Sequence, residues 1–156
     1  MGVDYTTKYT QINARGRASV RVESKKKYDG GLFIADIAHM PGSICGVWPA
    51  FWTVGLNDWP QDGEIDILEN ISEATVNVEA LHTGDDCVIT SDAQGGSLRT
   101  AHCSNDWTDG YSQWPTQGCS TTHTDALNSY GDGFNKQGGA IYAMVTVNLQ
   151  EVRGIC

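Results

Sequence analysis

Three carboxylates lie within six residues of one short segment, at Glu64, Asp66 and Glu69 in the sequence EIDILE. Acidic and apolar residues alternate at first, which is typical of a half-buried β-strand. Because side chains of a strand alternate between its faces, Glu64 and Asp66 share one face and Glu69 lies on the other. One extra residue near Ile67 and Leu68, a β-bulge, would return Glu69 to the shared face. The spacing therefore predicts three acids on one face of a bulged strand.

Two carboxylates at this spacing could hydrolyse a glycosidic bond. With the bulge, Glu64 and Glu69 are four strand steps apart, which is roughly 13 Å between Cα atoms. Side chains that lean together shorten this distance toward the separation of about 5–5.5 Å between nucleophile and acid/base in a retaining glycosidase. Asp66 between them could hydrogen-bond Glu64, and its negative charge would raise the pKa of Glu69 and keep that group protonated.

The same acids have two simpler explanations. They could form an exposed acidic edge strand, but the apolar residues Ile65, Ile67 and Leu68 indicate that the strand is half-buried. They could bind calcium, since hard cations prefer clustered carboxylates. The spacing of an EF-hand loop is absent from the sequence. We therefore predict no metal and no cofactor.

Three tryptophans precede the acids closely, at Trp48, Trp52 and Trp59. Aromatic rings beside paired carboxylates are typical of a sugar-binding cleft, in which ring faces stack on the apolar faces of sugars. Taken singly, each tryptophan is more often a core residue than a ligand platform. The combination of rings and acids favours the cleft.

Composition restricts the function further. The chain has 156 residues, 40% of them hydrophobic and 19% charged, which indicates one folded domain rather than a disordered chain. The sequence contains no run of eighteen apolar residues, so it predicts no membrane span. The first residues, MGVDYTTKYT, do not form a signal-peptide pattern. The formal net charge is −9. An acidic surface repels phosphate backbones, so we expect no nucleic-acid partner and a neutral substrate.

The elements that must position the acids are strands. Short β-rich runs alternate with turn signals, and helical periodicity is nearly absent, which predicts an all-β fold. The expected strands are Ser19–Ser24, Leu32–His39, Ala50–Val54, Glu64–Glu69, Thr75–His82 and Ala140–Leu149. The run Leu32–His39 is apolar on both faces, as in a fully buried strand. Two glycine-rich and polar stretches, Gly84–Thr100 and Asn105–Phe134, are expected to be long loops.

These features together resemble a known family, the family 16 glycoside hydrolases, and in particular fungal mixed-linked and β-1,3-glucanases. The family signature is E-x-D-x-x-E, which residues 64–69 match. The segments GLFIADIAHMPG (31–42), CGVWPAFWTVG (45–55), LHT (81–83) and YGDGFN (130–135) also match. The resemblance implies an antiparallel β-jelly-roll sandwich of the concanavalin-like type, with a sugar cleft on its concave face.

The resemblance also implies roles for individual residues. Glu64 corresponds to the catalytic nucleophile, Glu69 to the acid/base and Asp66 to the assisting aspartate. Substrate-binding residues are expected at Trp48 and Trp52, which help to form the cleft, and at His82, which would face the acid/base from the neighbouring strand. The implied substrate is a β-glucan polysaccharide, cleaved by an extracellular, monomeric enzyme.

The resemblance runs from about Val3 to about Tyr142, and members of the family carry further strands before and after this region. We therefore expect residues 1–144 to form a partial, incomplete catalytic domain, followed by a divergent tail over residues 145–156. The alternatives are a β-glucan-binding protein without turnover and an inactive truncated fragment of the same fold.

Five cysteines without C-x-x-C spacing favour disulfides and an oxidising compartment over a zinc site. Sequence alone leaves their connectivity open. Because four of them lie inside the family-like region, we expect these four to pair within the domain and the fifth, in the tail, to stay free. The four are Cys45, Cys87, Cys103 and Cys119, and the fifth is Cys156.

Overall fold

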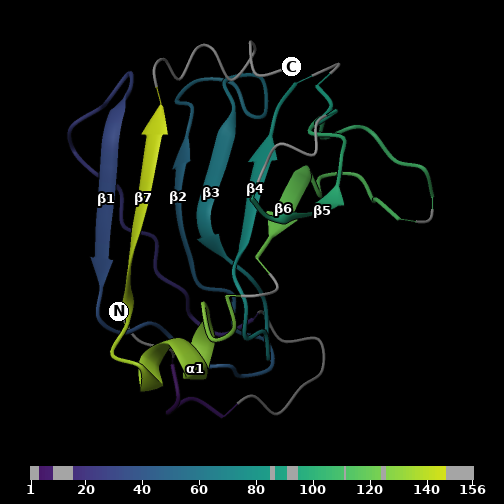
Figure 1. Ribbon diagram of the computed structural model, residues 1–156. Helices are drawn as coiled ribbons and strands as arrows, with labels where there is room; N and C mark the ends of the chain where they lie inside the picture. Colours follow the sequence, from purple (N-terminus) through teal and green to yellow (C-terminus); the bar gives the residue numbers. More distant parts are fainter. Residues whose placement is uncertain are drawn as a thin grey trace.

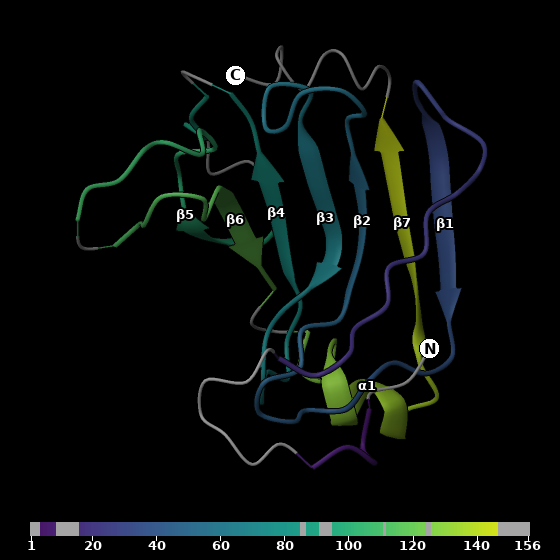
Figure 2. The same cartoon turned by 180° about the vertical axis from the view of Figure 1, so that it is seen from behind.

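The computed structural model describes residues 4–8, 16–84, 87–90, 95–110, 112–123 and 126–146. Strands dominate this part of the chain, and its one α-helix is short (Figures 1 and 2). The elements in chain order are β1 (Gly31–Ile37), β2 (Ala50–Val54), β3 (Glu64–Glu69), β4 (Val78–His82), β5 (Ser97–Thr100), β6 (Cys119–Thr122), α1 (Gly131–Lys136) and β7 (Ala140–Thr146).

The strands form two sheets. The larger sheet has the order β2-β3-β4-β6-β5, and the smaller one pairs β1 with β7. Every one of these pairings is antiparallel. In both views β7 falls between β1 and β2, and α1 closes one end of the molecule (Figures 1 and 2). The predicted all-β, antiparallel fold class is confirmed.

The main core lies where the end of β3 meets α1 and β7. Its buried members are Met40, Leu68, Tyr130 and Phe134. The Tyr130 hydroxyl lies 2.6 Å from the backbone oxygen of Pro49 and 2.6 Å from that of Asn70. These two oxygens belong to the residues just before β2 and just after β3. The buried tyrosine therefore fixes the end of β3 that carries Glu69.

A second cluster is built from sulfur atoms and lies beside β4 and β6. Cys103 and Cys119 form a disulfide, and Cys87 is buried in the same cluster. The expectation that Cys45 also pairs is wrong, because Cys45 is exposed and free on the turn before β2, away from this cluster. Cys156 lies outside the described residues.

Several expected elements differ from those observed. Residues 19–24 are exposed and form no strand, since no described segment pairs with them. The expected full burial of Leu32–His39 is also wrong, because Leu32 and Ile34 are both 62% exposed on the outward face of β1. The stretches expected to be long loops contain β5, β6 and α1. β5 and β6 are strands because they pair with segments distant in the sequence, and such pairing is not visible in the local pattern of residue types.

The expected last strand, Ala140–Leu149, is confirmed as β7 through Thr146, and residues 147–149 lie outside the described residues. Among the described residues, no helix has the length and hydrophobicity that a membrane span requires.

Candidate active site

The predicted bulge is present in β3. On the neighbouring strand β2, Phe51 pairs with Leu68 and the next residue, Trp52, pairs with Asp66, so Ile67 is the extra residue. The register against β4 shifts in the same stretch, between Asp66 and Glu69. An extra residue reverses the alternation of side chains beyond it. The bulge thus places Glu69 on the face that carries the other two acids.

A buried asparagine stabilises this bulge. The side-chain amide of Asn77, just before β4, donates to the backbone oxygen of Ile67 at 2.8 Å and accepts from the backbone nitrogen of Glu69 at 2.8 Å. Asn77 is 4% exposed. Backbone groups that a bulge removes from the strand ladder need other partners when they are buried. Asn77 supplies both partners, and the sequence pattern did not single it out.

Each glutamate receives a hydrogen bond from a tryptophan. The indole nitrogen of Trp48 donates to Glu69 Oε1 at 2.6 Å, and that of Trp59 donates to Glu64 Oε2 at 2.7 Å. Both rings remain partly open to solvent, with Trp48 69% and Trp59 47% exposed. The structure therefore brings Trp48 to the site as expected. Trp59 was not assigned to the site, although its place between Trp52 and Glu64 was a usable signal.

The loop between β2 and β3, residues 55–63, brings the indole of Trp59 to Glu64. The backbone nitrogen of Gly55 donates to the oxygen of Gly63 at 2.9 Å. A Cβ atom on Gly55 would lie 2.6 Å from the backbone oxygen of Asp62, so only glycine fits there. The close approach of the two strands at this loop sets the position of Trp59.

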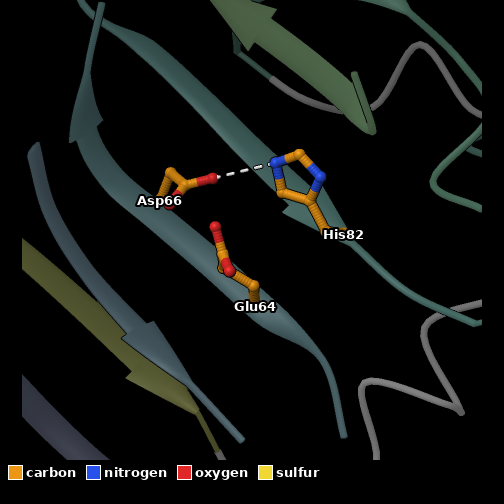
Figure 3. A group of neighbouring side chains, drawn as sticks. All are labelled: Glu64, Asp66 and His82. Carbon is orange, nitrogen blue, oxygen red and sulfur yellow. Dashed lines mark ion pairs between the residues drawn. The ribbon is translucent and has the colours of Figure 1, made fainter. Parts of the chain in front are cut away.

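His82 lies on β4 directly opposite Glu64 in the strand register. Its Nε2 is 3.2 Å from Asp66 Oδ2, and its Nδ1 is 2.9 Å from Asn105 Oδ1. The side chains of Glu64, Asp66 and His82 point toward one another (Figure 3). His82 is expected to face Glu69, but strand pairing places it at the Glu64 end of β3, where its ring nitrogens lie against Asp66 and Asn105.

Trp52 pairs with Asp66 across β2 and β3, so its ring lies on the face of the acids. The guanidinium carbon of Arg21 lies 4.4 Å from the centre of that ring. This is a cation–π contact. Trp52 is therefore at the site as expected, with a basic side chain stacked on it.

The electrostatic environment favours the protonated form of each glutamate. Burial, followed by the charge of Asp66, raises the pKa of Glu64 and the pKa of Glu69 above the usual value of 4.5. The hydrogen bonds from Trp59 and Trp48 act in the opposite direction, because they stabilise the carboxylate form. For His82, burial lowers the pKa, but the contacts with Asp66, Asn105 and Glu64 outweigh burial and raise it above 6.5.

Glu64, Asp66 and His82 each offer one metal-ligating atom, and these atoms lie within 4.8 Å of one another. A metal ligand must be deprotonated. The Nε2 atom of His82 faces Asp66 Oδ2 at 3.2 Å, a position that suits a proton rather than an ion. The absence of a metal stays a prediction.

The sequence matches a family described as "XgeA-like, catalytic GH16 domain" over residues 1–151. The chain belongs to glycoside hydrolase family 16.

Relatives of this family 16 chain include a probable endo-1,3(4)-β-glucanase of Aspergillus niger, which is 47% identical over 144 residues, or 92% of this chain and 18% of that protein. The endo-1,3(4)-β-glucanase xgeA of Emericella nidulans is 48% identical over 145 residues, covering 92% of this chain and 21% of that protein. The chain thus spans about a fifth of the length of these curated relatives.

Solved structures show the same fold. An elongating GH family 16 β-1,3-glucosyltransferase is 50% identical, with a TM-score of 0.75 over 93% of this chain and 46% of that chain. The GH16 laminarinase 16A of Phanerochaete chrysosporium, solved with β-glucans in its donor and acceptor sites, is 37% identical, with a TM-score of 0.75 over 88% of this chain and 44% of that chain. The predicted jelly-roll fold class is thereby confirmed for this family 16 chain.

Proposed function

We propose that this chain carries the catalytic centre of a retaining endo-β-glucanase, which hydrolyses internal β-1,3 or β-1,3/1,4 glucosidic bonds. The observation that supports the proposal most directly is the arrangement on β3. Glu64 and Glu69 lie on one face, each with an indole N–H on its carboxylate, and Asp66 lies between them. This arrangement supplies two carboxyl groups on one face of a strand, as glycoside hydrolysis requires.

In the first step, Glu69 acts as a general acid and gives its proton to the glycosidic oxygen. The carboxylate of Glu64 attacks the anomeric carbon, so the bond to the leaving sugar breaks and a glycosyl-enzyme ester forms. In the second step, Glu69 acts as a base and takes a proton from water. The water oxygen then attacks the anomeric carbon and releases Glu64, so the configuration is retained.

The neighbours of the two glutamates suit these roles. Burial, and then the negative charge of the buried Asp66, raise the pKa of Glu69 and favour the proton that a general acid must carry. The N–H of Trp59 stabilises the Glu64 carboxylate that must attack. Trp48, Trp52 and His82 would line the glucan-binding cleft.

Two variants separate the roles of the glutamates. Glu69→Ala should abolish cleavage of natural glucans, which have poor leaving groups, while the first step on activated aryl glycosides continues because it needs no acid. Glu64→Ala should abolish both reactions. The measurements are the rate of sugar release from laminarin and lichenan and the rate of aryl alcohol release, in the first turnover, from an aryl β-glucoside oligomer. Equal losses on all substrates for both variants would contradict the assignment.

The stereochemistry gives an independent test. Proton NMR of freshly released product should show the β-anomer before mutarotation. Early appearance of the α-anomer would exclude the two-step mechanism.

Glucosyl transfer is a second candidate, because a structure 50% identical to this chain is that of an elongating β-1,3-glucosyltransferase. The same glycosyl-enzyme would then be attacked by a sugar hydroxyl instead of water. Incubation with laminari-oligosaccharides distinguishes the two, since transfer produces oligosaccharides longer than the substrate and hydrolysis does not.

We further propose that the protein acts outside the cell as a monomer and that residues 1–144 form the catalytic portion, with a tail over 145–156. A β-glucan-binding protein without turnover would bind laminarin but release no reducing sugar. An inactive fragment would show neither binding nor a cooperative thermal transition.

A further inference from the structure

Both ring nitrogens of His82 face oxygen atoms. Nε2 lies 3.2 Å from the carboxylate oxygen Oδ2 of Asp66, and Nδ1 lies 2.9 Å from the amide oxygen Oδ1 of Asn105. A neutral imidazole has one donor and one acceptor nitrogen, whereas the imidazolium has two donors. Two facing oxygens are therefore satisfied together only when His82 carries both protons.

Asn105 is built into the fold rather than exposed. It is 3% exposed, its backbone nitrogen donates to the oxygen of Thr83, and its backbone oxygen accepts from the nitrogen of Thr116. The Cys103–Cys119 disulfide closes the loop that contains it. These contacts hold the Asn105 side chain against His82 independently of any substrate.

The same loop encloses the histidine ring from a second direction. Gly118 has φ +66°, and a Cβ atom there would lie 2.9 Å from His82 Nδ1. Backbone packing this close leaves the ring little freedom to turn. The loop therefore fixes the orientation of the ring as well as its hydrogen-bond partner.

We propose that Asn105 is a positioning residue of this site, which holds His82 as an imidazolium aimed at Asp66. Only the effect of Asn105 on catalysis rests on the proposed function, whereas its effect on the protonation of His82 does not. The imidazolium supplies a fixed positive charge between β3 and β4, where Glu64 and Asp66 would otherwise repel each other. Such a cation keeps the Asp66 carboxylate in place between the two glutamates.

The charged groups around His82 support this protonation state. The groups that act on its ring are the acids Glu64 and Asp66 and the neutral Asn105, and its charge also interacts with Glu69, so no cation is among them. Trp59, whose ring centre is 6.2 Å away, is neutral. The reversed orientation of the Asn105 amide would present an N–H to Nδ1 and leave the ring neutral beside two carboxylates. Measurement of the ring protonation distinguishes these two arrangements.

The experiment is ¹⁵N NMR of the full chain with labelled histidine, which reads the protonation of each ring nitrogen directly. The four histidines give four ring signals, and His82→Gln identifies the one of interest. At neutral pH both ring nitrogens of His82 should be protonated. The pKa of His82 should lie above the value of an ordinary histidine, which is about 6.5. One deprotonated ring nitrogen at neutral pH would overturn the proposal.

Variants of Asn105 test its part in this state. Asn105→Leu has nearly the same size but no acceptor, and should lower the pKa of His82 by about one pH unit or more. Asn105→Asp keeps an acceptor and adds a negative charge, so it should raise the pKa of His82. This variant gives a decisive measurement even if Asn105→Leu folds poorly. Thr108→Ala is the matched control, because it removes a hydrogen bond to Gln113 in the same loop without facing His82. An unchanged His82 titration in a folded Asn105→Leu or Asn105→Asp variant would refute the role.

Kinetics give a second readout. If Asn105 positions the charge, Asn105→Leu should lower kcat by about tenfold or more, leave KM nearly unchanged and shift the pH profile. A general loss of folding would instead lower the amount of active protein without moving the pH profile. A chain that shows the imidazolium but hydrolyses no glucan would refute the proposed function and leave this inference standing.

Discussion

Asn77 holds Glu69 by its backbone, through a hydrogen bond of 2.8 Å from the Glu69 nitrogen to the Asn77 side-chain oxygen. The proposed acid/base is therefore positioned by the shape of the strand as well as by the hydrogen bond from Trp48 to its carboxylate. The side-chain nitrogen of Asn77 donates a hydrogen bond to the backbone oxygen of Ile67, which lies inside the bulge. One buried side chain thus maintains the irregularity that brings Glu69 onto the face of the other acids.

Asn77→Ala should destabilise the protein by about 2–6 kcal/mol, because it leaves two buried backbone groups unpaired at about 1–3 kcal/mol each. Asn77→Asp should also destabilise the protein, since it keeps the acceptor for Glu69 but sets a buried carboxylate against the backbone oxygen of Ile67. Denaturant unfolding gives these free energies. The control is Asn57→Ala on the exposed β2–β3 turn, which is expected to change stability by no more than about 0.5 kcal/mol. A loss in Asn77→Ala as small as in this control would contradict the role in the bulge.

The two indole donors should set different limbs of the pH–rate profile. Trp48→Phe removes the hydrogen bond that lowers the pKa of Glu69, so the basic limb should move to higher pH. Trp59→Phe removes the corresponding bond to Glu64, so the acidic limb should move to higher pH. The measurement is kcat/KM on laminarin as a function of pH. Trp114→Phe, at an indole that is 60% exposed and away from both glutamates, serves as the control. Movement of the same limb in both site variants would be inconsistent with two separate roles.

Stability should fall as the pH rises. Glu64, Glu69 and His82 all have folded-state pKa values above their ordinary ones, so the folded state binds more protons than the unfolded state. The contribution of each glutamate to the free energy of unfolding is fully present below pH 4.5, and that of His82 is fully present below pH 6.5. Each contribution is lost as the pH rises through the folded value of that group. Thermal melts should therefore show a Tm that declines from mildly acidic toward alkaline pH. Glu69→Gln, which cannot ionise, should reduce this slope, and an unchanged slope would exclude Glu69 as one of its sources.

The outward face of β1 and β7 should contribute little to stability, and at high protein concentration it should cause non-specific aggregation of the monomer. Leu32 and Val145 pair across the two strands and are 62% and 73% exposed. Replacing both with Thr should change the free energy of unfolding by no more than about 0.5 kcal/mol, and light scattering should show less association. Phe134→Ala, at a side chain that is 0% exposed, should instead cost about 3–5 kcal/mol. A large stability loss in the threonine variant would mean that this face is covered in solution.

The sequence by itself determined the strand that carries the three acids. The spacing of Glu64, Asp66 and Glu69 conflicts with strict alternation, and one extra residue is the smallest change that resolves the conflict. The position of that bulge followed from the chain alone, because side-chain direction in a strand depends on local geometry. The strands with strong local patterns, Ala50–Val54 and Glu64–Glu69, were identified for the same reason.

Only the tertiary structure decided what surrounds these acids. Asn77 and Asn105 are polar residues without a distinctive neighbourhood in the chain, and they act through atoms of residues 8 and 23 positions away. The Cys103–Cys119 pair and the exposure of Cys45 depend likewise on which segments fold together. Hydrogen bonds, disulfides and burial between distant segments arise from how strands pair, and a local pattern of residue types does not contain that information.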